Sequence, residues 1–243
     1  MVELSKLREL DKWALARLDE VIEKVKNAYE AMDYYLAYHT IISFCVVDMS
    51  NFYLDIVKDT LYCEAENSPL RKSVQTAMFI ILDSLVRLVA PILCYTADEI
   101  WGFMPHRKSD DLRSVVFNQM PEKTGVAADE EKWAKIHAVR DDVLAALEQK
   151  RAEKIIGKPL EAEVAIFTDD ESLKALESDL ADACIVSKAV VNIGGEGEYK
   201  GSACSVTVKK KSGEPCARCW KFDDSVGCDE KYPNLCKRCA DVI

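Results

Sequence analysis

The fold of the C-terminal end is decided by two short stretches, CARCW at residues 216–220 and LCKRC at residues 235–239. Each stretch holds two cysteines separated by two residues, and 16 residues lie between Cys219 and Cys236. A two-residue spacer allows a tight turn that points both sulfurs at one ion, and two such turns complete a closed tetrahedral site. Four thiolates leave no position for a reactive water. The sequence therefore predicts one structural Zn²⁺, with Cys216, Cys219, Cys236 and Cys239 as its ligands.

The chain contains ten cysteines, a number that disulfide-rich secreted proteins also reach. Five of them are scattered through apolar or strand-like sequence, as free buried thiols are: Cys45, Cys63, Cys94, Cys184 and Cys204. A reducing cytoplasm and a metal site fit this placement better than disulfides do. An iron centre of the rubredoxin type uses the same four ligands, so the spacing alone leaves Zn²⁺ and iron open. We expect Cys228, between the two pairs, to be a free thiol.

Basic residues gather around the cysteine pairs in a chain whose formal net charge is −10. A protein that coats DNA would be basic, so any nucleic-acid contact here must use a local patch. The candidates for that patch are Arg218, Trp220, Lys221, Lys237 and Arg238. Cations beside an exposed ring suit a single-stranded loop, through phosphate contacts and base stacking. Alternatively, Trp220 packs inside the ribbon and the basic side chains only keep it soluble.

Residues 1–106 carry helical patterns throughout. Apolar residues between Leu7 and Met32 recur every three or four positions, which predicts one long amphipathic helix. The segment from Tyr34 to Tyr62 is apolar on most sides and predicts a central helix of a bundle. Its longest uncharged run, Tyr34 to Val47, has 14 residues, fewer than the ~20 that span a membrane. We therefore expect a buried core helix there and no membrane partner.

Three sequences predict helix starts. Ser68-Pro69 combines a capping residue with a proline, which suits the first helical turn. Residues 96–99 (TADE) and 168–171 (TDDE) have the capping-box spacing, in which a threonine is followed three positions later by a glutamate. We expect one short helix to begin at each of these boxes.

Four parts are expected along the chain: a helical bundle over residues 1–125, a helical linker over 126–160, a small α/β unit over 161–211 and the zinc ribbon over 212–243. Strand-like alternation over 161–168, 188–193 and 203–209 predicts the sheet of the α/β unit. The glycines at 194–197 predict a turn and not a dinucleotide fingerprint, because no helical pattern follows them. The expected fold class is mainly α, with a small α/β unit and a C-terminal zinc ribbon held by four cysteines.

Several motifs resemble isoleucyl-tRNA synthetases of the bacterial type, a class I family. Residues 50–62 (SNFYLDIVKDTLY) are similar to a segment of the helical anticodon-binding domain, and so are residues 9–18 (ELDKWALARL). Residues 90–101 resemble the same domain further on, in a pattern that valyl and leucyl enzymes share. Residues 151–162 (RAEKIIGKPLEA) are similar to the family's linker, and both cysteine stretches resemble its C-terminal zinc ribbon. Order and spacing agree along essentially the whole chain.

The sequence departs from this family in one decisive way. Both ATP-site signatures, His-Ile-Gly-His and Lys-Met-Ser-Lys-Ser, are absent, and the three histidines (His39, His106 and His137) are isolated. No P-loop or nucleophile–base motif is present either. We therefore expect no catalytic residues in this chain. The resemblance implies that the catalytic and editing domains of a parent isoleucine–tRNA ligase lie outside it.

The resemblance implies recognition of isoleucine tRNA through its anticodon stem-loop in the cytoplasm, which would position the tRNA for ATP-dependent aminoacylation. DNA is not an expected partner. The matching motif adds Asn51 and Lys58 to the tRNA-binding candidates, but Asp55 and Lys58 are also spaced to form a surface ion pair. Two other functions stay open: a zinc-ribbon scaffold for protein interactions without an RNA role, and a DNA glycosylase, some of which end in a similar ribbon.

Overall fold

The computed structural model describes all residues from Met1 to Ile243, which form two compact units. The first, here called the helical unit, comprises Met1–Leu61 and Glu66–Ala128. The second, here called the mixed unit, comprises Tyr62–Ala65 and Asp129–Ile243. The four-part division expected from the sequence is finer than this split and stays a prediction.

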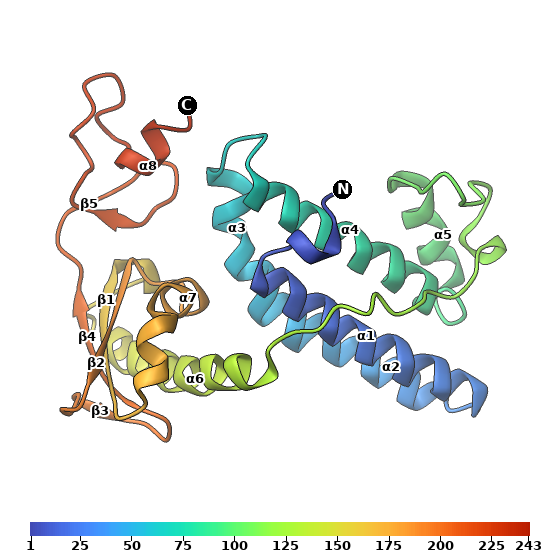
Figure 1. Cartoon of the computed structure of the whole chain (residues 1–243), viewed down its shortest axis with the longest axis horizontal. Coiled ribbons are helices and arrows are strands. Elements are labelled where there is room, and N and C mark those ends of the chain that lie inside the picture. The colour runs from blue at the N-terminus through green and yellow to red at the C-terminus, as the bar shows by residue number, and fades with distance from the viewer. The chain divides into compact units, whose positions relative to one another are not determined.

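The helical unit is built around α1. Its elements are η1 (Leu4–Lys6), α1 (Glu9–Glu30), α2 (Tyr34–Ser43), the π-helix η2 (Phe44–Tyr53), α3 (Leu54–Cys63), α4 (Pro69–Val89), α5 (Cys94–Phe103) and η3 (Val115–Phe117). Helix α1 contacts both α2 and α4 along its length (Figure 1). The apolar stripe predicted for this helix is confirmed, since Leu15, Leu18 and Val25 are completely buried. Helix α1 is therefore the centre of the bundle.

The segment Tyr34–Cys63 forms one continuous run of α2, η2 and α3. Residues such as Ala37, Ile41 and Phe44 are buried, but much of the opposite face is exposed. The prediction of a central buried helix is wrong, because α1 occupies the centre and this segment packs on one side of it. By length and composition the run could cross a membrane, with 39% of its most apolar window buried. One such helix is weak evidence for a membrane span, since core helices of soluble proteins pass the same test.

A buried carboxylate links three parts of the bundle. Asp11 on α1 is completely buried. It accepts hydrogen bonds from the Tyr53 hydroxyl at 2.8 Å, the Ser73 hydroxyl at 2.6 Å and Arg8 Nε at 3.0 Å. Arg8 Nη1 also donates to Thr60 Oγ1 at 3.1 Å. Burial, together with the Asp11 carboxylate, holds the pKa of Tyr53 far above its ordinary value, so its hydroxyl stays a donor. These partners offset the cost of burying the charge.

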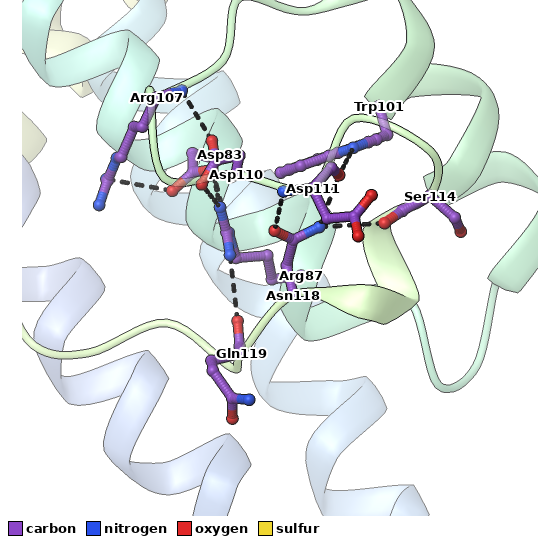
Figure 2. Close-up of polar contacts among 9 residues, drawn as sticks. All are labelled: Asp83, Arg87, Trp101, Arg107, Asp110, Asp111, Ser114, Asn118 and Gln119. Atoms are coloured by element: carbon purple, nitrogen blue, oxygen red, sulfur yellow. Dashed lines mark hydrogen bonds and ion pairs between the residues drawn. The ribbon is translucent and has the colours of Figure 1, made fainter.

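Residues 104–114 and 118–128 lack regular structure, yet ion pairs hold this loop to α4 (Figure 2). The Arg87 guanidinium contacts Asp83 at 3.0 Å and Asp110 at 2.9 Å, with all three side chains nearly buried. It also lies over the Trp101 ring, 4.9 Å from its centroid. Arg107 adds a pair with Asp83 at 3.1 Å. Because the side chains of Arg87, Asp83 and Asp110 are nearly buried and mutually paired, they fix the course of the loop.

The two capping boxes do not act as predicted. Helix α5 (Cys94–Phe103) begins before Thr96, and Asp98 instead accepts a hydrogen bond from the Val115 amide at 3.2 Å. Thr168 is the last residue of strand β1 and is paired with Ile193 of β2, so it is not the residue that caps the next helix. Asp170 caps the next helix, accepting from the Ser172 amide at 2.9 Å. Tertiary pairing therefore displaced both predicted starts.

The mixed unit joins a four-stranded sheet to the cysteine ribbon. Its elements are α6 (Glu130–Ala152), η4 (Pro159–Glu161), β1 (Ala162–Thr168), η5 (Glu171–Leu176), α7 (Glu177–Ala183), β2 (Lys188–Ile193), β3 (Tyr199–Lys200), β4 (Ser205–Lys210), β5 (Glu214–Pro215), β6 (Phe222–Asp223) and α8 (Lys237–Ala240). The sheet order is β2-β1-β4-β3, with β1 and β2 parallel and the other pairs antiparallel. Helix α6 packs on β4 and β1, and α7 on β2. The three predicted strands are confirmed.

A second carboxylate fastens α6 to the start of β4. Asp142 is 6% exposed and accepts hydrogen bonds from the amides of Ser202 (3.0 Å), Ala203 (2.7 Å) and Cys204 (3.0 Å). Burial alone would raise the pKa of Asp142, but these three backbone donors outweigh it and lower the pKa below its ordinary value. A carboxylate is therefore the form that the loop requires.

We predict that Tyr53→Phe destabilises the helical unit by about 1–3 kcal/mol, because Asp11 loses a donor while staying buried. The measurement is the midpoint of denaturant unfolding, followed by circular dichroism at 222 nm. Tyr95→Phe is the matched control, since Tyr95 is 89% exposed. Equal midpoints for the two variants would show that the hydroxyl of Tyr53 contributes nothing.

We predict that Asp142→Asn destabilises the mixed unit by about 1–3 kcal/mol at pH 7, because an amide presents one acceptor oxygen where the loop offers several donors. The folded-state pKa of Asp142 is lowered, so its contribution is present above the ordinary value of 3.8 and is lost as the pH falls below it. The difference from wild type should therefore shrink in acid. Asp141→Asn, at the exposed neighbouring position, is the control. A pH-independent difference would contradict this account.

Candidate metal centre and nucleic-acid surface

The ribbon, residues 212–243, brings the two cysteine pairs together through its turns. Strands β5 and β6 pair as a short hairpin around Cys216 and Cys219. The Ala217 amide then donates to the Asn234 carbonyl at 3.0 Å, which ties the first turn to the second. Cys236 is the N-cap residue of α8, and Cys239 lies inside that helix. The four sulfurs all lie within 4.8 Å of one another, and all four residues are buried.

The geometry of the four sulfurs fits a tetrahedral metal ion. Bonds of about 2.3 Å to Zn²⁺ place neighbouring sulfurs about 3.8 Å apart. The Cys219 and Cys236 sulfurs are separated by 3.8 Å. The Cys236 amide also donates to the Cys216 sulfur at 3.3 Å, the kind of contact that orients a metal-bound thiolate. The predicted ligand set is therefore assembled in the fold.

The acidities of these thiols also point to a cation. Burial opposes ionisation of Cys216, but backbone amides outweigh it and lower its pKa to about 6. Burial raises the pKa of Cys219 to about 11, and burial with the neighbouring sulfurs raises that of Cys239 further. The Cys216 thiolate thus forms easily, while Cys219 and Cys239 need a positive ion beside them to ionise. A dication bound at the centre supplies that charge.

The ribbon has few apolar residues with which to fold. Apart from cysteines, the buried residues of its cluster are Leu235 and Ala240, with Val226 and Tyr232 partly buried beside them. A core of this size cannot offset the chain entropy of about 30 ordered residues. The metal bonds therefore supply the stability that the packing lacks.

The other cysteines take no part in this centre. Cys228 is exposed and lies outside the cluster, which confirms the prediction of a free thiol. Cys63, Cys184 and Cys204 are buried as expected. Cys94 is exposed, so the prediction of burial is wrong there. No disulfide is formed.

Trp220 presents its ring to solvent. The residue is 67% exposed, and its backbone has a φ of 62°, the left-handed conformation that residues other than glycine rarely adopt. The turn fixes that conformation, because the Trp220 amide donates to the Cys216 carbonyl at 2.9 Å. Packing of Trp220 inside the ribbon, one of the two alternatives, is therefore wrong. The metal turn holds an indole outward at some cost in backbone strain.

The basic candidates around Trp220 fall into two groups. Lys237 and Arg238 are exposed on α8, the helix that carries the second cysteine pair. Arg218 donates to the carbonyl oxygens of Cys239 and Tyr62, both at 3.4 Å within the mixed unit. Lys221 forms an ion pair with Asp182 at 3.2 Å. Arg218 and Lys221 thus have structural partners that the sequence did not reveal.

The two remaining candidates lie in the helical unit. Asn51 and Lys58 are exposed on η2 and α3. Lys58 forms the ion pair with Asp55 that its spacing allowed, at 2.6 Å, with the two side chains 63% and 44% exposed. An exposed pair of this kind contributes little to stability, so it leaves both charges able to exchange partners.

Comparison with known families gives two matches along the chain. Residues 11–166, more than half of the chain, match the family described as the anticodon-binding domain of tRNA ligase. The chain belongs to this family. Residues 213–242 match a zinc finger found in FPG and IleRS. With four buried, converging cysteines, this match settles the choice between zinc and iron: the ribbon binds one structural zinc.

The chain is similar along its whole length to isoleucine–tRNA ligases. It is 38% identical over 250 residues to that of Geobacter sulfurreducens, 40% over 256 to that of Geobacillus thermodenitrificans and 41% over 251 to that of Syntrophotalea carbinolica. Each alignment covers 100% of this chain but 27% of the relative. The chain therefore spans about a quarter of the length of these relatives, at their C-terminal end.

We predict that Cys216→Ser releases the zinc and unfolds the ribbon while the helical unit stays folded, because the metal is the ribbon's main source of stability. Zinc content by mass spectrometry and ellipticity at 222 nm are the two measurements. Cys228→Ser, which removes a thiol outside the cluster, should keep one zinc per chain. Loss of helical signal throughout the chain in Cys216→Ser would contradict separate stabilisation of the two units.

Proposed function

We propose that this chain recognises isoleucine tRNA through its anticodon stem-loop and positions that tRNA for ATP-dependent aminoacylation. The observation that carries the proposal is the similarity of the entire chain to one end of isoleucine–tRNA ligases, combined with the family match over residues 11–166. The catalytic and editing domains of the parent synthetase are its expected partners, in the cytoplasm. The chain itself carries out no chemistry in this proposal.

The chemistry of the ribbon surface supports RNA as the ligand. Trp220 offers a flat apolar ring, and the exposed Lys237 and Arg238 offer two cations on the adjoining helix. Unpaired bases stack on such rings, while their phosphates pair with such cations. The whole chain has a formal net charge of −10, and residues 212–243 hold five basic and six acidic residues, so RNA is disfavoured away from these two cations. Binding would thus be confined to local patches.

The remaining ribbon candidates have positioning roles in this proposal. Arg218 fastens the first cysteine turn through the Cys239 and Tyr62 carbonyls, and Lys221 is paired with Asp182. The zinc holds both turns and contributes no reaction step, since its four protein ligands leave no open position. Asn51 and Lys58 remain candidate contacts on the helical unit, where Lys58 would exchange Asp55 for a phosphate.

A scaffold without an RNA role is the second candidate function. The acidic net charge of −10 favours it, because most of the surface attracts basic or neutral partners more than RNA. The glycosylase alternative has less support. The ribbon family also includes FPG proteins, but the larger match, over residues 11–166, is to tRNA ligases.

We predict that the chain binds isoleucine tRNA more tightly than tRNAs with other anticodons, as measured by fluorescence anisotropy across a salt series. Anticodon substitution in isoleucine tRNA should remove the preference. Trp220→Ala should weaken binding by about 1–3 kcal/mol if one base stacks on the ring, whereas Trp220→Phe should retain much of the affinity. Lys237→Ala should reduce the salt slope by about 1.

The control for charge is Lys200→Ala, a position on β3 whose side chain is 70% exposed and paired with Glu196. This variant should leave both affinity and salt slope unchanged. Equal affinity for all tRNAs, or full binding by Trp220→Ala, would contradict the proposed surface. A complex with a protein partner that is insensitive to salt and to ribonuclease would favour the scaffold instead.

A further inference from the structure

An exposed apolar surface runs along α2 and the first turn of η2. It is here called the α2 face and comprises Tyr35 (75% exposed), Tyr38 (48%), Ile42 (42%), Val46 (48%) and Val47 (57%). Tyr35, Tyr38, Ile42 and Val46 are three or four positions apart and form one stripe on a helix, which Val47 extends in the π-helix η2. The stripe lies opposite the buried residues Ala37, Ile41 and Phe44, by which the same segment packs in the bundle.

This stripe is not the polar outer surface that an edge helix normally carries. No charged residue occurs in the 14 positions between Asp33 and Asp48. Figure 1 shows α1 flanked by α2 and α4, and no packing of α2 on α4 covers the stripe. An amphipathic helix turns a charged face to water, whereas a helix that is apolar on both sides is normally buried on both sides. The α2 face thus has the composition of an interface.

The dimensions of the surface fit one helix. A run of 14 residues extends about 21 Å, which a partner helix of about four turns can cover. Aromatic side chains at one end and β-branched ones at the other provide the ridges against which such a helix packs. Burial of these five side chains is the kind of contact that anchors stable domain interfaces.

We propose that the α2 face binds an apolar helix from the catalytic portion of an isoleucine–tRNA ligase. The relatives that match this chain are covered over only 27% of their length, so a much larger portion of the same enzyme is joined to the matched region and is available as a partner. The α2 face is an exposed apolar stripe on one continuous helical segment of this unit, which suits a contact with another helix. This partner rests on the proposed function, but the docking surface itself does not depend on tRNA binding.

The charge of the surface disfavours the other classes of occupant. RNA requires cations, and no lysine or arginine lies between Asp33 and Asp48. A membrane-surface helix carries basic residues along its polar side, whereas the other side of this segment is buried against α1. In a dimer, the α2 faces of two copies of the chain would pack against each other, and dimerisation would depend on the protein concentration.

The test uses the full chain and, as probe, the portion of the Geobacter sulfurreducens enzyme that this chain does not match, produced as a separate polypeptide. Isoleucine-dependent pyrophosphate exchange first verifies that the probe is folded. Isothermal titration calorimetry should then show a one-to-one complex. The double variant Ile42→Glu, Val46→Glu should weaken that complex at least tenfold. The control Tyr95→Glu, Phe103→Glu, which places the same two charges at aromatic positions on α5 that are 89% and 88% exposed, should not.

Because both substituted side chains are exposed, circular dichroism and the unfolding midpoint should stay at the wild-type values. Absence of a complex, or equal affinity for the double variant, would overturn the proposal. Concentration-dependent dimerisation of the wild-type chain that the double variant abolishes would assign the surface to a second copy. Loss of tRNA binding in the double variant would assign it to RNA. If the chain forms the complex with the catalytic portion but binds no tRNA, the docking surface is supported and the proposed function is rejected.

Discussion

The buried carboxylate of Asp11 determines how the helical unit is arranged. It accepts hydrogen bonds from Tyr53 and Ser73, which lie on either side of α1, and from Arg8 at the start of that helix. A charge completely removed from water is tolerated only where partners converge on it, so the helices that supply them must meet at α1. With α1 in the middle, the segment Tyr34–Cys63 is left at the edge of the bundle. The exposure of the α2 face follows from that placement.

The ribbon obeys a different constraint. It has almost no apolar core of its own. Four sulfurs within 4.8 Å of one another form the centre around which it folds. Metal–thiolate bonds are strong and directional, so they fix the backbone of both cysteine turns more closely than a small core would. The left-handed conformation of Trp220 is a consequence of that fixation. The zinc thus acts on function indirectly, by holding an indole and the neighbouring cations at the surface.

These two constraints give the chain two kinds of surface. The ribbon presents the exposed Trp220 with Lys237 and Arg238 on the next helix, which suits RNA. The α2 face is apolar and lies in a run of 14 residues without lysine, arginine, aspartate or glutamate, which suits another helix. Each surface lies within a unit that is stabilised by its own buried polar or metal centre. In the proposed function, the first surface would contact the tRNA and the second would contact the catalytic portion of the enzyme.

The sequence by itself determined the metal ligands, the long amphipathic helix α1 and the three main strands. Cysteine spacing and hydrophobic periodicity are local properties, and local geometry suffices to interpret them. Only the tertiary structure decided that Tyr34–Cys63 is an edge segment, that Trp220 is exposed and that Arg218 and Lys221 are engaged with partners. The edge position depends on the buried charge at Asp11, and the partners of Arg218 and Lys221 lie far away in sequence, at Tyr62, Cys239 and Asp182. The exposure of Trp220 depends on the turn that its amide closes with the Cys216 carbonyl. The burial of a side chain and its hydrogen-bond partners depend on which segments pack together, and the local sequence pattern does not specify that packing.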